Sequence, residues 1–168
     1  KEMKVKMPKE KARARSTYLP LCVYGLAGSG KTTFCLKAAE YIGWERTLWI
    51  HTERPVNQFS IPQYTSAKPF GLIDMQAEPV SKVLSALEPA ARAASGGKPL
   101  YDLVIIDSIS ELEFVNVATI EGGKTGVKQG KKPDGRQVWG DEMDDMLRLM
   151  WTLNSLGGHL IATAHVKE

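Results

Sequence analysis

The chain alternates between short, continuous apolar runs and longer stretches with helical spacing. Apolar runs occur at 21–25, 47–51, 103–106 and 159–164, and a weaker one spans 70–75. Runs of this length are typical of strands that are buried on both faces of a sheet. Strands that alternate with helices predict an α/β fold, with a mostly parallel central sheet and helices on both of its faces.

The first two helices are predicted between these runs. One spans 31–42, and Gly43 is suited to end it. The other spans 78–94, where apolar residues recur at helical spacing, with a disturbance expected at Pro89.

Two further helices are predicted in the second half of the chain. Ser108 and Glu111 have the spacing of a capping box, which predicts a helix from Ser108 to about Ile120. Gly140 or Asp141 precedes the last helix. Its apolar positions are expected to pack in the core: Met143, Met146, Leu147, Met150 and Leu153.

Two basic segments lie outside these elements. Residues 1–15 contain seven Lys or Arg against two Glu, and residues 121–136 contain five against two acids, although the whole chain carries only +3. Residues 1–16 are predicted to form a flexible arm, and 121–137, which is rich in glycine, a long exposed loop. Solvated charge and contact with a polyanion both remain open interpretations.

Composition is that of one globular domain, expected at 17–168. No stretch approaches the roughly 18 apolar residues of a membrane span, and the chain opens with lysines instead of a signal-peptide core. Cys22 and Cys35 lack metal-ligand spacing, so both are expected to be small core residues. A cytoplasmic protein without a membrane partner is expected.

A glycine-rich segment joins the first predicted strand to the first helix. Gly25, Gly30, Lys31 and Thr32 have the spacing of a phosphate-binding loop, in which backbone N–H groups and a helix N-terminus surround an anion. Lys31 is predicted to reach the β- and γ-phosphates of ATP, and the Thr32 hydroxyl to hold Mg²⁺. The predicted nucleotide-binding residues are Gly25, Ala27, Gly28, Ser29, Gly30, Lys31, Thr32 and Thr33.

Two carboxylates follow predicted strands. Asp107 ends the apolar run 103–106, at the sheet edge where α/β proteins bind ligands, and is predicted to hold Mg²⁺. Glu53 follows the strand at 47–51, and it can orient or deprotonate a water if the two strands are neighbours. A capping role for Asp107 and a plain surface position for Glu53 are the alternatives.

These motifs occur in the order seen in RecA-like ATPases. The segments 25–33, 48–53, 104–108 and 161–165 carry the resemblance, which covers roughly 18–168. The chain looks most like small phage-encoded RecA-fold ATPases of single-strand annealing and recombination. Such a protein would reside in the cytoplasm of the host cell.

The resemblance implies roles for the catalytic candidates Lys31, Glu53, Asp107 and His165. Glu53 would activate the water, and Asp107 would hold the magnesium ion. His165 stands where such ATPases usually have a Gln that senses the γ-phosphate, so the sequence departs from the pattern there. A purely structural role for His165 is the alternative, and His51 and His159 are expected to be structural.

The resemblance also implies nucleic-acid and protein partners. The segment 121–137 corresponds to a loop that binds single-stranded DNA. Its candidate DNA-binding residues are Lys124, Lys128, Lys131, Lys132 and Arg136. Trp139 either stacks a base or, the favoured interpretation, anchors the following helix. The resemblance also implies assembly into a homo-oligomeric ring or filament, in which Lys167 would contact the γ-phosphate bound by a neighbouring subunit. A single-strand-binding protein is a further implied partner.

Three functions compete at this stage. The first is a Mg²⁺-dependent ATPase that acts on single-stranded DNA in phage-type recombination or annealing. The second is a small P-loop kinase, which would need an arginine-bearing lid. The third is a nucleotide-dependent DNA-binding scaffold with negligible hydrolysis.

Overall fold

The computed structural model describes residues 18–53, 72–74, 77–94, 100–125 and 134–166. Within them the strands are β1 (Pro20–Gly25), β2 (Thr47–His51), β3 (Leu72–Asp74), β4 (Leu103–Asp107) and β5 (His159–His165). The helices are α1 (Lys31–Ile42), α3 (Val80–Ala94), α4 (Ile109–Thr125) and α5 (Gly135–Ser155), and a 3₁₀ turn, η1, covers Trp44–Arg46.

The strands form one parallel sheet in the order β1-β5-β4-β2-β3. His51 pairs with Asp107 between β2 and β4, and Gly25 pairs with His165 between β1 and β5. Because every strand runs in the same direction, these chain positions meet at one carboxyl edge of the sheet. The predicted α/β fold is confirmed, and β2 and β4 are neighbours, which is the condition for Glu53 to act beside Asp107.

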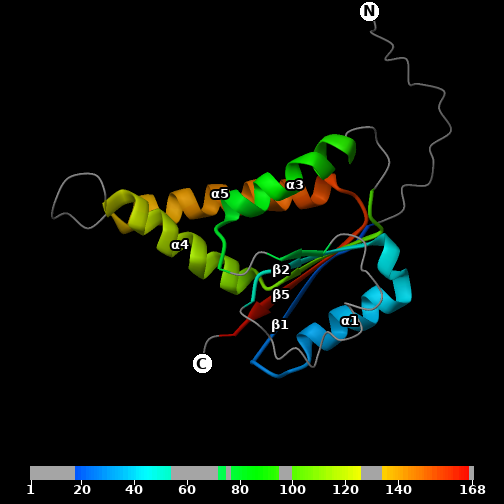
Figure 1. The fold of residues 1–168 in the computed structure, drawn as a ribbon. Helices are drawn as coiled ribbons and strands as arrows, with labels where there is room; N and C mark the ends of the chain where they lie inside the picture. The colour runs from blue at the N-terminus through cyan, green and yellow to red at the C-terminus, as the bar shows by residue number, and fades with distance from the viewer. Residues whose placement is uncertain (1–17, 54–71, 75–76, 95–99, 126–133, 167–168) are drawn as a thin grey trace, which may run out of the picture.

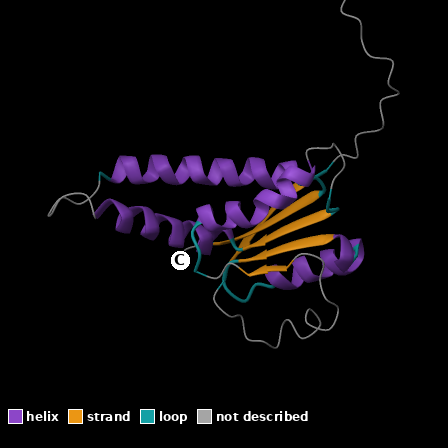
Figure 2. Ribbon diagram, turned by 45° about the horizontal axis from the view of Figure 1, so that its top comes forward, coloured by secondary structure: helices purple, strands orange, loops and turns teal. Residues whose placement is uncertain are grey.

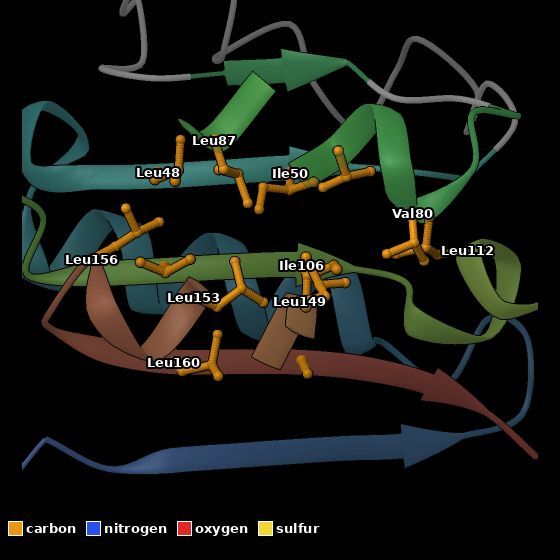
Figure 3. Close-up of a cluster of buried hydrophobic side chains, with 13 residues drawn as sticks. Leu48, Ile50, Val80, Leu87, Ile106, Leu112, Leu149, Leu153, Leu156 and Leu160 are labelled. Atoms are coloured by element: carbon orange, nitrogen blue, oxygen red, sulfur yellow. The ribbon is translucent and has the colours of Figure 1, made fainter. Parts of the chain in front are cut away.

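Helices cover both faces of the sheet. Figures 1 and 2 show α3, α4 and α5 on one side and α1 on the other. The larger core lies under α3 and α5, where Ile50, Ile106 and Leu153 are among the buried side chains (Figure 3). The smaller core packs α1, through Cys35, against Ile105 and its neighbours. Every residue of β4 is buried, and consecutive side chains enter opposite cores: Val104 and Ile106 lie in the larger, Leu103 and Ile105 in the smaller.

Several predicted boundaries are correct to within one or two residues. α1 spans 31–42, as predicted, and Gly43 follows it with its N–H bonded to the Ala39 carbonyl. α3 runs through Pro89 without ending, although proline lacks an N–H for the helix ladder. The basic arm predicted at 1–16 lies outside the described residues.

The loop predicted at 121–137 is wrong at both ends. α4 continues through Thr125, and α5 already begins at Gly135. Asp134 caps α5, since its carboxylate accepts a hydrogen bond from the Arg136 N–H at 3.0 Å. The glycines cost about 1 kcal/mol each in a helix. The cap and the tertiary packing of α5 offset that cost, whereas composition alone favoured a loop.

Four side-chain predictions are also wrong. Trp139 is 59% exposed and Met143 66% exposed, so neither anchors α5 in the core, and Leu147 is exposed as well. Met146, Met150 and Leu153 do contact the core. Cys22 is exposed because β1 pairs only with β5 among the described strands, which leaves it at the edge of the sheet.

Candidate nucleotide-binding site

The phosphate loop begins where β1 ends and continues directly into α1. Gly30 is the N-cap of α1 and has a φ of 89°, a left-handed conformation that glycine adopts without strain. A Cβ at Gly25 would lie 2.8 Å from the Ser29 hydroxyl, so a larger residue there would force the Ser29 side chain to move. No side chain caps the start of α1, which leaves its first N–H groups free for an anion.

Lys31 is held inside the loop. The residue is only 7% exposed, and its Nζ donates hydrogen bonds to the backbone carbonyls of Gly25 and Leu26, at 2.9 Å each. A third contact, of 3.3 Å, joins Nζ to Nδ1 of His165. The ammonium group is therefore held by the loop backbone, and the phosphates of a nucleotide would compete for it.

Asp107 is a fully buried carboxylate with two hydroxyl partners. Its Oδ2 accepts from the Thr32 hydroxyl at 2.9 Å, and its Oδ1 accepts from the hydroxyl of Thr163 on β5. The same environment raises the pKa of the Cys35 thiol to about 12, first through burial and then through the negative charge of Asp107. The carboxylate thus acts as a fixed negative charge beneath the phosphate loop.

Hydrogen bonds past the end of β2 bring Glu53 to this edge. The Thr52 N–H donates to the Asp107 carbonyl at 2.9 Å, and the Thr52 hydroxyl donates to the Ser108 carbonyl at 2.6 Å. Glu53 is the next residue, and the distance between its Oε1 and Nε2 of His165 is 2.6 Å. The predicted Glu53 and Asp107 are therefore brought to the same edge from adjacent strands.

His165 lies at the centre of the arrangement. Its backbone N–H donates to the Ser110 hydroxyl on α4 at 2.9 Å, and its ring contacts Lys31 on one side and Glu53 on the other. The four predicted catalytic candidates are thus all at one site: Lys31, Glu53, Asp107 and His165.

The residues present fit a magnesium ion. The Thr32 hydroxyl and the Asp107 carboxylate are hard oxygen donors 2.9 Å apart. Among the residues that the structure describes, no group of three or more His, Cys, Asp or Glu could form a metal cage. Mg²⁺ is commonly held by one or two protein oxygens together with substrate phosphates and water, so this sparse set is the kind expected.

Comparison with known protein families agrees with this geometry. A family model described as an AAA domain matches residues 17–168. The chain belongs to this AAA-domain family. Family membership indicates a nucleotide-binding, ATPase-type protein, which accounts for the phosphate loop. A search of curated proteins gave no match.

Of the remaining candidates of this AAA domain, two belong to the described helices. Lys124 is in the last turn of α4 and Arg136 in the first turn of α5. Lys128, Lys131, Lys132 and Lys167 lie outside the described residues. Within the described chain, no helix is long and apolar enough to cross a membrane.

Sequence reasoning missed three supporting residues. Thr163 binds Asp107, Thr52 joins β2 to β4, and Ser110 binds the His165 backbone. Thr163 had a signal: it is a polar residue within an apolar run and lies two residues before His165, on the same face of β5. The partners of Thr52 and Ser110 depend on the strand register, which the sequence alone does not give.

A cavity adjoins the site on the side of α4 and α5. Its volume is about 510 Å³, and His165 forms part of its wall. Two exposed aromatic side chains, Phe114 and Trp139, line it from different helices. The other lining residues are Ser110, Glu113 and Val117.

Proposed function

We propose that this AAA domain hydrolyses Mg²⁺-ATP and uses the reaction to act on single-stranded DNA in phage-type recombination or strand annealing. The convergence of Lys31, Glu53, Asp107 and His165 on one sheet edge is the observation that carries the proposal. A loop that only bound nucleotide would have no need for a second carboxylate beside the position of the γ-phosphate.

Each residue has a distinct task in the proposed reaction. Lys31 and the first N–H groups of α1 bind the β- and γ-phosphates. Thr32 and Asp107 hold the magnesium ion, which neutralises charge on the phosphates when bound. Glu53 orients the attacking water and accepts its proton, and His165 senses the γ-phosphate. Thr163 fixes the Asp107 carboxylate through its hydroxyl.

The DNA role is supported by the surroundings of α4 and α5. The lysine-rich segment 126–133 connects these helices, and Phe114 and Trp139 are exposed on them. Lysines contact the phosphates of a single strand, and aromatic rings stack on its bases. Since the cavity between the two aromatics also touches His165, a bound strand would lie close to the proposed sensor.

The proposal extends to self-assembly as a ring or filament. Exposed apolar residues on α5, among them Met143, Leu147 and Trp151, are available for contact with a neighbouring subunit. In such an assembly Lys167 would reach the γ-phosphate of the neighbouring site. A single-strand-binding protein is the proposed accessory partner, and the host-cell cytoplasm is the proposed location.

The deciding experiment is the steady-state ATPase rate with and without single-stranded DNA. We expect DNA to stimulate hydrolysis, and double-stranded DNA of the same sequence serves as the matched control. A rate that depends on an added metabolite, with phosphate transferred to it, would identify a kinase. Tight nucleotide and DNA binding with no turnover under either condition would identify a scaffold.

A further inference from the structure

One face of α4 is turned toward the cavity beside His165. The residues at positions i, i+3, i+4 and i+7 of this helix line the cavity: Ser110, Glu113, Phe114 and Val117. Positions with this spacing lie on one side of a helix. Leu112 and Asn116 belong to the same helix but are buried. Helix α4 therefore has one face that packs within the protein and another that can meet a ligand.

The aromatic side chains of the cavity are open to a planar ligand. Phe114 on α4 and Trp139 on α5 are both more than half exposed. Within the described part of the chain, neither ring contacts another aromatic ring. A volume of about 510 Å³ is in the range of small-molecule sites, roughly 300–1,000 Å³. A nucleobase suits this cavity, because it stacks on aromatic rings with little regard to sequence.

Two polar groups of the same helix face can distinguish one base from another. Glu113 forms no hydrogen bond or ion pair with any residue that the structure describes. Its carboxylate only accepts hydrogen bonds, so its ligand must donate. The Ser110 hydroxyl accepts from the His165 N–H at 2.9 Å, and its own hydrogen is therefore left to donate. The cavity thus presents an acceptor and a donor one helical turn apart.

This pair of groups matches the Watson–Crick edge of cytosine or adenine. Both bases carry an exocyclic amine, which can donate to Glu113, beside a ring nitrogen, which can accept from Ser110. Thymine and uracil have a carbonyl oxygen in place of the amine. That oxygen would face the carboxylate as a second acceptor, so no hydrogen bond would form and the two would repel each other.

We propose that this cavity holds one base of a single strand, stacked on Phe114 and Trp139 and selected by Glu113 for its exocyclic amine. The inference rests on the proposed action on single-stranded DNA. Arg136 lies one turn before Trp139 on α5 and is exposed, so it can contact the phosphate beside that base. A carboxylate repels phosphate, and Glu113 therefore suits the base and not the backbone.

The affinity of the whole chain for oligo-dC and oligo-dU of equal length tests the selection. The two oligonucleotides differ only along the Watson–Crick edge of the base. We expect the wild type to bind oligo-dC roughly tenfold more tightly, measured by fluorescence anisotropy. Glu113→Gln should bind both alike, because an amide can accept from the amine of cytosine or donate to the carbonyl of uracil.

The matched control for this variant is Glu121→Gln. Glu121 is an exposed residue of α4 that does not line the cavity, so its variant should keep the wild-type preference. Equal affinities for the two oligonucleotides in the wild type overturn the proposal. A preference that survives in Glu113→Gln overturns it as well.

The stacking part of the proposal has its own variants. Trp139→Leu and Phe114→Leu should each weaken the binding of both oligonucleotides roughly tenfold. Tyr41→Leu is the control, because Tyr41 is 90% exposed and belongs to α1, on the other side of the sheet. Wild-type affinity in both cavity variants would contradict stacking at this site.

Free deoxycytidine separates this proposal from the proposed function. If oligonucleotides bind but show no preference that depends on Glu113, the DNA role stands and the base site is wrong. If no oligonucleotide binds while free deoxycytidine does, and Glu113→Gln removes its advantage over deoxyuridine, the base site stands and the DNA role fails. If neither ligand binds, both proposals are wrong.

Discussion

At the scale of single residues, the buried charge of Asp107 depends on its hydroxyl partners. A carboxylate that is removed from water must keep its hydrogen bonds, because an unpaired buried charge is strongly destabilising. Thr32 and Thr163 each donate one bond, to different oxygens of the carboxylate. Of these, Thr32 is also a proposed magnesium ligand, so Thr163 is the cleaner position to test.

Thr163→Val should lower the free energy of unfolding by about 1–3 kcal/mol, because it leaves one oxygen of Asp107 without a donor. The two side chains have nearly the same shape, so packing changes little. Chemical denaturation measures the effect. Thr119→Val is the matched control: Thr119 is exposed and bonds only its own helix, so a change within about 0.5 kcal/mol is expected. Equal effects at both sites would contradict the role assigned to Thr163.

At the scale of elements, a buried polar contact joins α4 to α5. The Asn116 amide donates to Glu142 at 2.5 Å and to Asp145 at 3.2 Å, and its oxygen accepts from the Val80 N–H at the start of α3. Glu142 is 3% exposed, and its Oε1 has no hydrogen-bond partner among the described residues. Burial raises the pKa of Glu142, and the charges of Glu113 and Asp145 raise it further, against the lowering effect of the Asn116 bond.

This raised pKa makes stability depend on pH. The unfolded chain releases the Glu142 proton at its ordinary pKa, whereas the folded protein still holds it. The contribution is therefore fully present below the ordinary glutamate pKa and is lost as pH rises toward the folded value. Glu142→Gln should flatten the decline of the unfolding free energy from acid toward neutral pH. The exposed control Glu88→Gln should keep the wild-type slope, and a wild-type slope in Glu142→Gln would contradict the assignment.

A glycine within α5 allows the helical conformation of this segment to be tested. Gly140 lies within α5, and a Cβ built there meets nothing within 4 Å. Gly140→Ala should therefore raise the free energy of unfolding by about 0.5–1 kcal/mol. Gly158→Ala is the contrasting variant, because Gly158 has a φ of 85° and its Cβ would lie 2.6 Å from the Asp102 carbonyl carbon. Destabilisation by Gly140→Ala would contradict a helical conformation with open space at Gly140.

The elements also show what the sequence can and cannot predict. Continuous apolar runs and the phosphate-loop spacing were enough to predict β2, β4 and α1 closely. The start of α5 was missed because glycines and lysines resemble a loop, whereas the Asp134 cap and buried Val138 favour a helix. The contact between His165 and Glu53 depends on strand order, since β5 and β2 lie on either side of β4. Local sequence patterns do not contain that order.

At the scale of the whole molecule, charge is unevenly distributed around α4 and α5. Acidic residues are frequent on both helices, whereas the segment that joins them is rich in lysine. A nucleic acid would be attracted to the lysines and repelled by the acidic helix surfaces. We therefore expect the phosphate contacts to be concentrated near the connection between these helices.

Neutralising Lys124, Lys128, Lys131 and Lys132 to Gln should weaken single-stranded DNA binding and reduce its dependence on salt. Each lost phosphate contact lowers the slope of log K against log salt by about 0.7 for a single strand. Fluorescence anisotropy at several salt concentrations measures this slope. Lys37→Gln, at an exposed position of α1, is the control and should leave the slope unchanged. An unaltered affinity and slope in the quadruple variant would show that DNA binds elsewhere.

In the proposed reaction, Glu53 activates the water that attacks ATP at this sheet edge. Steady-state ATP hydrolysis by Glu53→Gln, measured beside nucleotide binding, tests it most directly. Gln keeps an oxygen that can accept from His165 but cannot take a proton, so we predict retained ATP binding and a fall in turnover of about 10²-fold or more. Glu40→Gln, at an exposed position of α1, should hydrolyse ATP at the wild-type rate. Wild-type hydrolysis by Glu53→Gln would contradict the account.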